Sequence, residues 1–194
     1  MFNEFALMMV MMWPAIPMFL IQLHFKADFW RRLGIWTYFV VILEWIPIAF
    51  ILYLLREFIL QVEIQLPRPF MFLGVILIVA GIVLHSWTAK LIGLKATIGY
   101  TELKPDEQST QTGLITSGPF SVVRHPSYWA HTAIITGFFL ITEVASLGVI
   151  ALVDLGITYF VTTTLEDKEL VDRFGDQYRN YKKNVPKLFP KLRK

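Results

Sequence analysis

The residues that could do chemistry gather in one short run, Arg124–Tyr128, which stands between two blocks of apolar sequence. The run offers a fixed cation, a titratable imidazole, a hydroxyl and a phenol. Because a proline disfavours helical backbone in the residue before it and suits the first turn of a helix, we expect a helix to begin at Pro126, with His125 outside it. The first N–H groups of a helix have no partner within it and attract anions. The run therefore predicts a site that binds an acidic group.

The elements that must position this run are long apolar segments. The chain has 194 residues, of which 55% are hydrophobic and 17% charged. No charged residue lies between Glu4 and Lys26 or within 69–89, and the segment 33–55 contains only Glu44. Because about 20 apolar residues suffice to cross a bilayer, the sequence predicts an integral membrane protein. The chain contains no cysteine, which excludes disulfides, thiolate metal ligands and a cysteine nucleophile, and we predict no metal site.

We predict an all-α fold, a polytopic membrane bundle of about five transmembrane helices followed by a cytosolic amphipathic helix. Four consecutive parts form this one membrane domain: three transmembrane helices with their links (1–94), a cytosolic loop with the motif (95–126), a short transmembrane helical hairpin (127–164), and a cytosolic C-terminal helix with its tail (165–194). Pro14 and Pro17 are expected to kink the first helix, and Gly175 to bend the last.

The basic residues predict the orientation of the bundle. All Lys and Arg residues except Arg56 and Arg68 lie in the first link, around the long loop or in the carboxyl-terminal tail. By the positive-inside rule these three parts face the cytosol, and the amino terminus lies outside. We therefore expect a multi-pass protein whose site faces the cytosol, with Arg124 and Glu166 on the same side. The membrane would be the cell membrane in a prokaryote or the endoplasmic reticulum in a eukaryote.

Several ionisable residues fall inside the predicted spans. An ionisable group in the bilayer interior is costly, and it marks either function or a polar contact between helices. For Glu44 both interpretations stay open, and His85 either faces a polar cavity or snorkels to the interface. For His131 and Asp154 a structural partnership is favoured over catalysis.

The second half of the chain resembles the isoprenylcysteine carboxyl methyltransferases, integral membrane enzymes that use S-adenosylmethionine. The resemblance rests on an ordered set of motifs: Leu114-Ile-Thr-Ser-Gly-Pro-Phe120, Arg124-His-Pro-Ser-Tyr128, the acidic pair Glu166-Asp167, Phe174-Gly-Asp-Gln-Tyr-Arg-Asn-Tyr181 and Val185-Pro186. It implies that the cofactor is held by Leu114, Ile115, Phe120, His125, Pro126, Ser127, Tyr128 and Glu166. The amino-terminal half shows no such match.

The resemblance also implies a reaction. A methyl group would pass from S-adenosyl-L-methionine to the carboxylate of a C-terminal isoprenylcysteine or a related lipophilic carboxylate, leaving S-adenosyl-L-homocysteine. An activated methyl group and an ionised carboxylate need alignment and desolvation rather than a base. Arg124 is the candidate for positioning that carboxylate, because its planar guanidinium can bind one with two hydrogen bonds. The alternative is that Arg124 holds a lipid headgroup or a helix end.

The natural acceptor stays open, because Thr162 stands where animal members carry an arginine implicated in holding the substrate. A phospholipid amine methyltransferase would use the same cofactor with another acceptor. Membrane sterol reductases share a similar carboxyl-terminal pattern, so the pocket could hold NADPH, although no Gly-x-Gly-x-x-Gly motif is present. A channel or scaffold is disfavoured, because the polar groups gather at one interface. The expected partners are a lipophilic or lipidated acceptor entering from the membrane and membrane lipid, with no nucleic acid.

Overall fold

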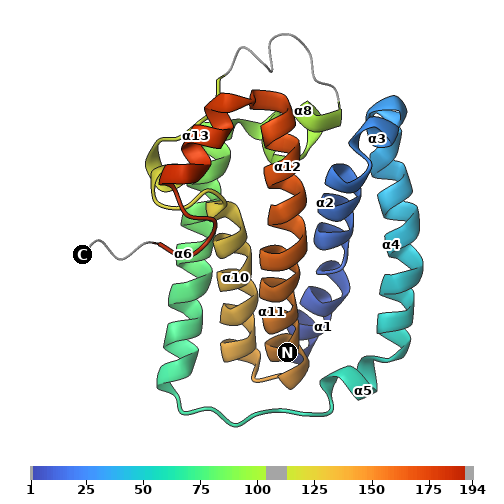
Figure 1. Cartoon of the computed structure of the whole chain (residues 1–194). Helices are drawn as coiled ribbons and strands as arrows, with labels where there is room; N and C mark the ends of the chain where they lie inside the picture. Colours follow the sequence, from blue (N-terminus) through green and yellow to red (C-terminus); the bar gives the residue numbers. More distant parts are fainter. Residues whose placement is uncertain (1, 104–112, 191–194) are drawn as a thin grey trace.

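The computed structural model describes residues 2–103 and 113–190, which form an upright bundle of helices (Figure 1). The elements in chain order are α1 (Phe2–Met12), α2 (Ala15–Phe25), α3 (Ala27–Leu33), α4 (Trp36–Leu54), α5 (Arg56–Leu60), α6 (Pro69–Ile92), α7 (Leu94–Thr97), α8 (Tyr100–Leu103), the 3-10 turn η1 (Gly118–Ser121), α10 (Pro126–Thr142), α11 (Ala145–Ile157), the π-helical turn η2 (Thr158–Thr162), α12 (Thr163–Phe174) and α13 (Asp176–Asn184). Within these ranges the only strand-like feature is an isolated bridge between Glu63 and Val144. The predicted all-α fold is confirmed.

Within the described residues, four helical stretches are long and apolar enough to cross a membrane: Asn3–Phe25, Trp36–Leu54, Pro69–Ile92 and Ala145–Phe174. An integral membrane helix bundle is thereby confirmed. The remaining predicted crossing corresponds to α10, which has 17 residues. At 1.5 Å per residue this helix is about 26 Å long, somewhat less than a bilayer core of about 30 Å. It lies inside the bundle, next to α6 and α11 (Figure 1).

The first apolar stretch breaks where its prolines predict. α1 ends at Met12 and α2 begins at Ala15, because Pro14 has no N–H to contribute to the helical ladder. At this break the indole Nε1 of Trp13 donates a hydrogen bond of 2.8 Å to Asp154 of α11. The kink therefore connects the amino-terminal helix to the last membrane-spanning stretch.

Three glycines allow α6 and α10 to pack closely. A Cβ added at Gly74 would lie 2.8 Å from the carbonyl oxygen of Gly137, and one at Gly137 would lie 2.7 Å from the carbonyl oxygen of Gly74. A Cβ at Gly81 would lie 2.7 Å from the carbonyl oxygen of Ala130. Small residues at helix contacts are a common means of packing in membranes. This contact fixes α10, and with it the Arg124–Tyr128 run, against α6.

The predicted hairpin forms, but its second helix runs further than expected. α10 and α11 are joined by a turn at Glu143, whose φ is 60° and whose carboxylate accepts a hydrogen bond from the N–H of Leu66 at 3.0 Å. The second helix then passes through η2 into α12 and ends at Gly175, with φ 56°. That the chain leaves the membrane near residue 164 stays a prediction. The residues that follow, although polar, favour helix, and no breaker occurs before Gly175.

The polar links lie at one end of the bundle. Figure 1 shows α3, α8, α12 and α13 at the top, and the amino terminus and α5 at the bottom. Arg124 and Glu166 therefore lie at the same end, as the distribution of basic residues predicts.

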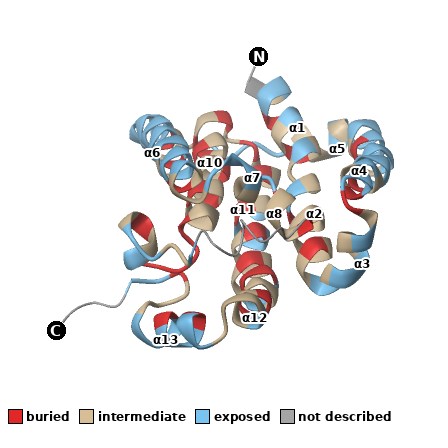
Figure 2. Cartoon of the chain, turned by 90° about the horizontal axis from the view of Figure 1, so that it is seen from above, coloured by how far each residue is buried: buried red, intermediate tan, exposed pale blue. Residues whose placement is uncertain are grey.

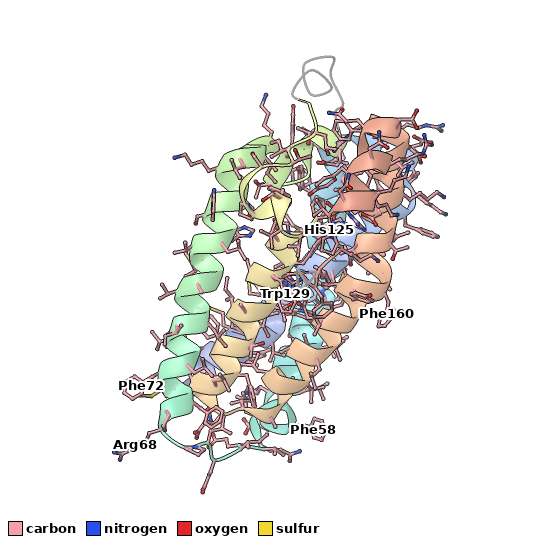
Figure 3. All side chains as sticks on the ribbon, turned by 60° about the vertical axis from the view of Figure 1, so that its left-hand side comes forward. Phe58, Arg68, Phe72, His125, Trp129 and Phe160 are labelled. Atoms are coloured by element: carbon pink, nitrogen blue, oxygen red, sulfur yellow. The ribbon has the colours of Figure 1, made fainter. Side chains whose placement is uncertain are left out.

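The outer faces of the bundle are apolar. α4 and α6 are largely exposed along their length (Figure 2), and large side chains such as Phe72 and Phe160 project outward (Figure 3). The buried side chains, in contrast, include many polar ones: Thr37, Thr88, Arg124, His125, Thr132, Thr142, Asp154, Thr158, Thr162, Thr163, Asp167 and Glu169. Apolar outside and polar inside is the arrangement expected where lipid is the solvent.

Candidate active site

The Arg124–Tyr128 run is held in place by the chain that follows α13. The N–H groups of Arg124 and His125 donate to the carbonyl oxygens of Pro186 and Lys187, at 2.9 and 3.2 Å. The indole of Trp129 donates to the carbonyl oxygen of Leu188 at 2.6 Å. As predicted, α10 begins at Pro126, and His125 has non-helical angles of φ −124° and ψ 62°. The carboxyl-terminal segment thus forms part of the site's framework.

Asp167 is the centre of the polar cluster, a role that no sequence pattern predicted. Its carboxylate receives Arg124 Nη2 at 2.8 Å, Arg124 Nε at 3.3 Å, His125 Nε2 at 2.9 Å, the Tyr178 hydroxyl at 2.5 Å and Lys182 Nζ at 3.2 Å. Only 4% of the Asp167 side chain is exposed. A buried carboxylate requires such partners, because leaving it unpaired would be costly. The signal available in the sequence was its position next to Glu166.

His125 bridges the two acids of the pair. Its Nδ1 lies 3.1 Å from Glu166 Oε2, and its Nε2 lies 2.9 Å from Asp167 Oδ1. Burial works to lower the pKa of His125, but the two carboxylates outweigh it and raise the pKa above its usual value. Because both ring nitrogens face acceptors, His125 is held as an imidazolium that donates in both directions.

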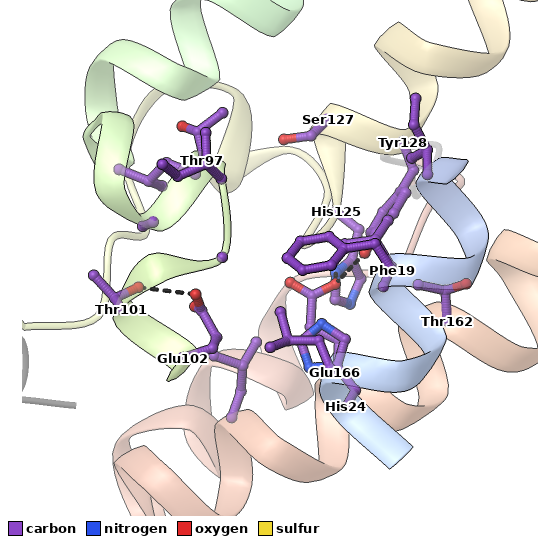
Figure 4. Close-up of a pocket in the computed structure, with 18 of the residues that line it drawn as sticks. Phe19, His24, Thr97, Thr101, Glu102, His125, Ser127, Tyr128, Thr162 and Glu166 are labelled. Atoms are coloured by element: carbon purple, nitrogen blue, oxygen red, sulfur yellow. Dashed lines mark hydrogen bonds and ion pairs between the residues drawn. The ribbon is translucent and has the colours of Figure 1, made fainter. Parts of the chain in front are cut away.

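Glu166 has one carboxylate oxygen engaged and one left for a ligand. Oε2 accepts the hydrogen bond of the Tyr128 hydroxyl at 2.9 Å and also faces His125. No hydrogen bond to Oε1 occurs within the described part of the chain, and a quarter of the side chain is exposed. Figure 4 shows His125, Tyr128 and Glu166 gathered on one side of the cavity, with Phe19 and His24 of α2 beside them.

These groups border a cavity of about 730 Å³ between the helices. Of the predicted cofactor residues, those that line it are Leu114, Ile115, Phe120, His125, Ser127, Tyr128 and Glu166. Pro126 does not line this cavity; it is buried and borders a separate apolar groove with Trp129 and Leu188. Thr162 also lies in the cavity wall, in the π-helical turn. Such turns are frequent at functional sites.

Arg124 lines the cavity, but its guanidinium is largely engaged by the protein. Nε and Nη2 form the paired contact with Asp167, and Nη1 donates to the carbonyl oxygens of Val185 and Lys182 at 2.7 and 3.3 Å. The planar group that we expected to bind a substrate carboxylate thus holds an internal one in this structure. The geometry favours the alternative, in which Arg124 anchors the end of a helix.

The polar end of the cavity is covered by α8. Glu102 of α8 pairs with Arg173 of α12 at 3.3 Å, and Arg31 of α3 donates to Glu169 of α12 at 3.2 Å and to the carbonyl oxygen of Glu102 at 3.1 Å. Across the cavity from Glu166, Figure 4 shows Thr101 and Glu102. Two buried donor or acceptor atoms on the cavity wall, His24 Nδ1 and Arg173 Nε, have no partner among the described residues.

The opposite end of the cavity reaches Asp154. This carboxylate is 2% exposed and accepts hydrogen bonds from Trp13 and Thr132, both at 2.8 Å. Nδ1 of His131 lies 3.2 Å away. The structure thus brings together His131 and Asp154, and adds Trp13, to which no sequence pattern pointed. Glu44, by contrast, is exposed on α4 and is hydrogen-bonded by Gln22, and His85 lies on the cavity wall.

Known proteins share part of this sequence. The family described as "Phospholipid methyltransferase" matches residues 69–177, which include Arg124, Asp154 and Glu166. The chain is 32% identical over 122 residues to methanethiol S-methyltransferase of Pseudomonas deceptionensis, covering 62% of this chain and 43% of that protein. It is 30% identical over 103 residues to protein-S-isoprenylcysteine O-methyltransferase of Rattus norvegicus, covering 52% of this chain and 36% of that protein.

A third relative is named for metal resistance, not for methyl transfer. It is the nickel-cobalt-cadmium resistance protein NccN of Alcaligenes xylosoxydans xylosoxydans, which is 32% identical over 81 residues, covering 42% of this chain and 38% of that protein. The chain spans less than half the length of each of these curated relatives. No solved structure matches it. Because the family match covers more than half of the chain, including the motif that resembles isoprenylcysteine carboxyl methyltransferases, this chain belongs to the phospholipid methyltransferase family.

Proposed function

We propose that this protein is an integral membrane methyltransferase that uses S-adenosyl-L-methionine and a lipophilic acceptor. The observation that carries the proposal is the cavity itself, which joins a charged cluster at the polar end of the bundle to an apolar interior. Its volume of about 730 Å³ lies within the range of about 300–1,000 Å³ that is usual for small-molecule sites. Family membership supports the transfer of a methyl group.

The donor and acceptor groups on the wall fit this cofactor. Glu166 offers a carboxylate oxygen for an ammonium or for ribose hydroxyls. His24 Nδ1 and Arg173 Nε are buried polar atoms in need of a partner, and the free N–H groups at the start of α10 suit a carboxylate. Leu114, Ile115 and Phe120 add apolar surface for a base.

In this proposal the protein binds and orients the cofactor and excludes water. When bound, S-adenosylmethionine supplies a methyl group on a sulfonium, which needs no further activation. His125, held as an imidazolium by two carboxylates, and Tyr128 fix the orientation of Glu166. The ion pair of Glu102 with Arg173 keeps α8 over the polar end. Alignment of the reactants and exclusion of water can raise the rate of such a transfer by several powers of ten.

The acceptor is proposed to enter from the membrane, because the inner part of the cavity lies among apolar helices. Two relatives are named for methylating methanethiol and isoprenylcysteine, one a small thiol and the other a lipid-modified residue. A carboxylate acceptor, expected from the resemblance, stays a prediction, but Arg124 does not offer it a free guanidinium here. The phospholipid amine acceptor and the NADPH alternative also stay predictions.

We propose that the polar end of the bundle faces the cytosol, since the cofactor is water-soluble and is made there. Its basic residues, including Lys182 and Lys183 of α13, suit an anionic cytoplasmic leaflet. Cysteines introduced at Glu63 and Gln108, in a chain without native cysteine, should react with impermeant reagents from opposite sides. Labelling of both cysteines from the same side of the membrane would overturn this orientation.

Calorimetry with detergent-solubilised protein tests the cofactor. S-adenosylhomocysteine should bind, and NADPH should not. Glu166→Gln should weaken S-adenosylhomocysteine binding about tenfold or more, because a hydrogen bond to a charged group contributes about 1.5–3 kcal/mol. Glu57→Gln, an exposed acid in α5 at the other end of the bundle, is the matched control and should bind as the wild type does. Binding of NADPH in place of S-adenosylhomocysteine would overturn the proposal.

A further inference from the structure

The inner end of the cavity contains a built polar site that the proposed cofactor contacts leave unused. Asp154 of α11 is almost fully buried and accepts hydrogen bonds from the Trp13 indole and the Thr132 hydroxyl, both at 2.8 Å. His131 of α10 faces the same carboxylate through Nδ1 at 3.2 Å. At a rise of 1.5 Å per residue, Asp154 and Glu166 are separated by about 18 Å along the helix axis. The two acids thus mark the two ends of one cavity.

The orientation of His131 leaves one ring nitrogen available. With Nδ1 donating to Asp154, the neutral ring carries its lone pair on Nε2. Nε2 has no hydrogen-bond partner within the described part of the chain, and one fifth of the side chain is exposed. Both His131 and Asp154 line the cavity. A carboxylate that orients an imidazole toward a pocket is the arrangement that produces a general base.

A purely structural role does not require this histidine. Trp13 and Thr132 already give each oxygen of Asp154 a donor, since the indole bonds Oδ1 and the hydroxyl bonds Oδ2. His131 shares Oδ1 with Trp13. An imidazole that only filled space between helices would be replaceable by an apolar side chain. A lining residue whose second ring nitrogen has no partner among the described residues is what a reaction with a protic substrate would use.

Methyl transfer requires a base only for some acceptors. A carboxylate is ionised at neutral pH and needs none, and Asp154 would repel it. A thiol is neutral, and its thiolate is the nucleophile. An amine arrives as an ammonium, whose pKa of about 10 makes its proton hard for an imidazole to remove. The thiol pKa of about 8.5 is the nearest to that of imidazole, about 6.5, so proton transfer to a histidine costs least for this class.

On the basis of the methyltransferase function proposed above, we propose that the acceptor is a thiol and that His131 is its general base, positioned by Asp154. In the step, the thiol sulfur forms a bond to the methyl carbon while the bond from that carbon to the donor's sulfonium breaks. The electron pair of the broken bond stays on the donor sulfur, and the thiol proton passes to His131 Nε2. The products are a methyl thioether, neutral S-adenosylhomocysteine and one proton. Asp154 stabilises the imidazolium that forms.

The choice of acceptor allows a direct test. The substrates are an alkanethiol, which is protonated at neutral pH, and an aromatic thiol, which is largely ionised and needs no base. The variant is His131→Asn, because the asparagine side-chain amide can replace Nδ1 as the donor to Asp154 while it removes Nε2. Turnover of the alkanethiol should fall by about 100-fold or more. Turnover of the aromatic thiol should fall by less than about tenfold, and S-adenosylhomocysteine affinity should stay at the wild-type value.

Thr132→Val is the matched control, because it removes a different donor from the same carboxylate. It should lower thermal stability but leave the ratio of turnover on the two thiols unchanged. If His131→Asn lowers turnover on both thiols equally, or on neither, His131 is not the base. If the wild type methylates a lipophilic carboxylate or phosphatidylethanolamine but no thiol, the acceptor class is wrong while the methyltransferase proposal stands. If the wild type binds no S-adenosylhomocysteine and methylates no acceptor, both proposals are overturned.

Discussion

Two buried pairs of aspartate and histidine have their histidines on the wall of the same cavity, and they are built in opposite ways. At the polar end, Asp167 is surrounded by the cations of Arg124, His125 and Lys182. At the inner end, Asp154 meets one imidazole and two neutral donors. The first aspartate is compensated by fixed charge, whereas the second is compensated by hydrogen bonds that carry no charge of their own.

The histidines differ accordingly. Both ring nitrogens of His125 face carboxylates, so this residue cannot accept a proton from a substrate. His131 engages one nitrogen with Asp154, its other nitrogen has no hydrogen-bond partner within the described part of the chain, and its side chain lines the cavity. The comparison teaches that the residue type alone does not identify a base. What matters is whether the partners leave a lone pair exposed.

The largest expected effect comes from removing the charge of each aspartate in turn. Asp167→Asn leaves buried Arg124 without its counter-ion, and breaking a buried pair in this way costs about 3–5 kcal/mol of folding free energy. Asp154→Asn disturbs mainly neutral hydrogen bonds and should cost about 1–3 kcal/mol. Thermal unfolding in one detergent measures both. Equal losses in the two variants would contradict the distinction between the clusters.

A smaller effect is expected for Arg124→Lys. Lysine keeps the charge but loses the planar pair of bonds to Asp167, so stability should fall by about 1–3 kcal/mol. Turnover per folded molecule should stay within about threefold of the wild type, a difference of under 1 kcal/mol in the barrier. A variant of normal stability whose turnover drops tenfold would instead restore Arg124 as the group that positions an acceptor.

The smallest effect is a dependence of stability on pH. Because the pKa of His125 is raised in the folded protein by the facing carboxylates, its stabilising contribution is complete below its unfolded pKa of about 6.5 and is lost as the pH rises through the folded value. The gap in unfolding temperature between the wild type and His125→Gln should therefore narrow from acidic to alkaline pH. A gap that widens with pH would show that His125 is not held as an imidazolium.

Local sequence patterns predicted much of this structure. The apolar runs identified the membrane-spanning helices, and the proline after His125 predicted the start of α10. The motifs also identified Arg124 and seven residues of the cavity wall that the resemblance assigns to the cofactor. These features depend on residues close together in the chain, so their physical signals can be read directly.

The features that were not predicted depend on distant contacts. Asp167 meets Arg124 and Tyr178 only after three helices have packed, and the break at Pro14 gives no sign that Trp13 will reach Asp154. Arg124 looked available because the carboxylate that occupies it lies 43 positions away. The continuity of α11 with α12 could not be predicted, because a drop in hydropathy marks where lipid ends, not where a helix ends.

A structure of the protein in complex with S-adenosylhomocysteine tests the central claim most directly. The account predicts that the ligand's amino-acid group lies against Glu166 and that its sulfur, which marks where the methyl group leaves, lies on the side of the cavity toward His131. Glu166→Gln crystals grown with the ligand should show weakened occupancy. A ligand whose sulfur points away from His131, or that binds in the apolar groove beside Trp129, would contradict the assignment of a cofactor end and an acceptor end to one cavity.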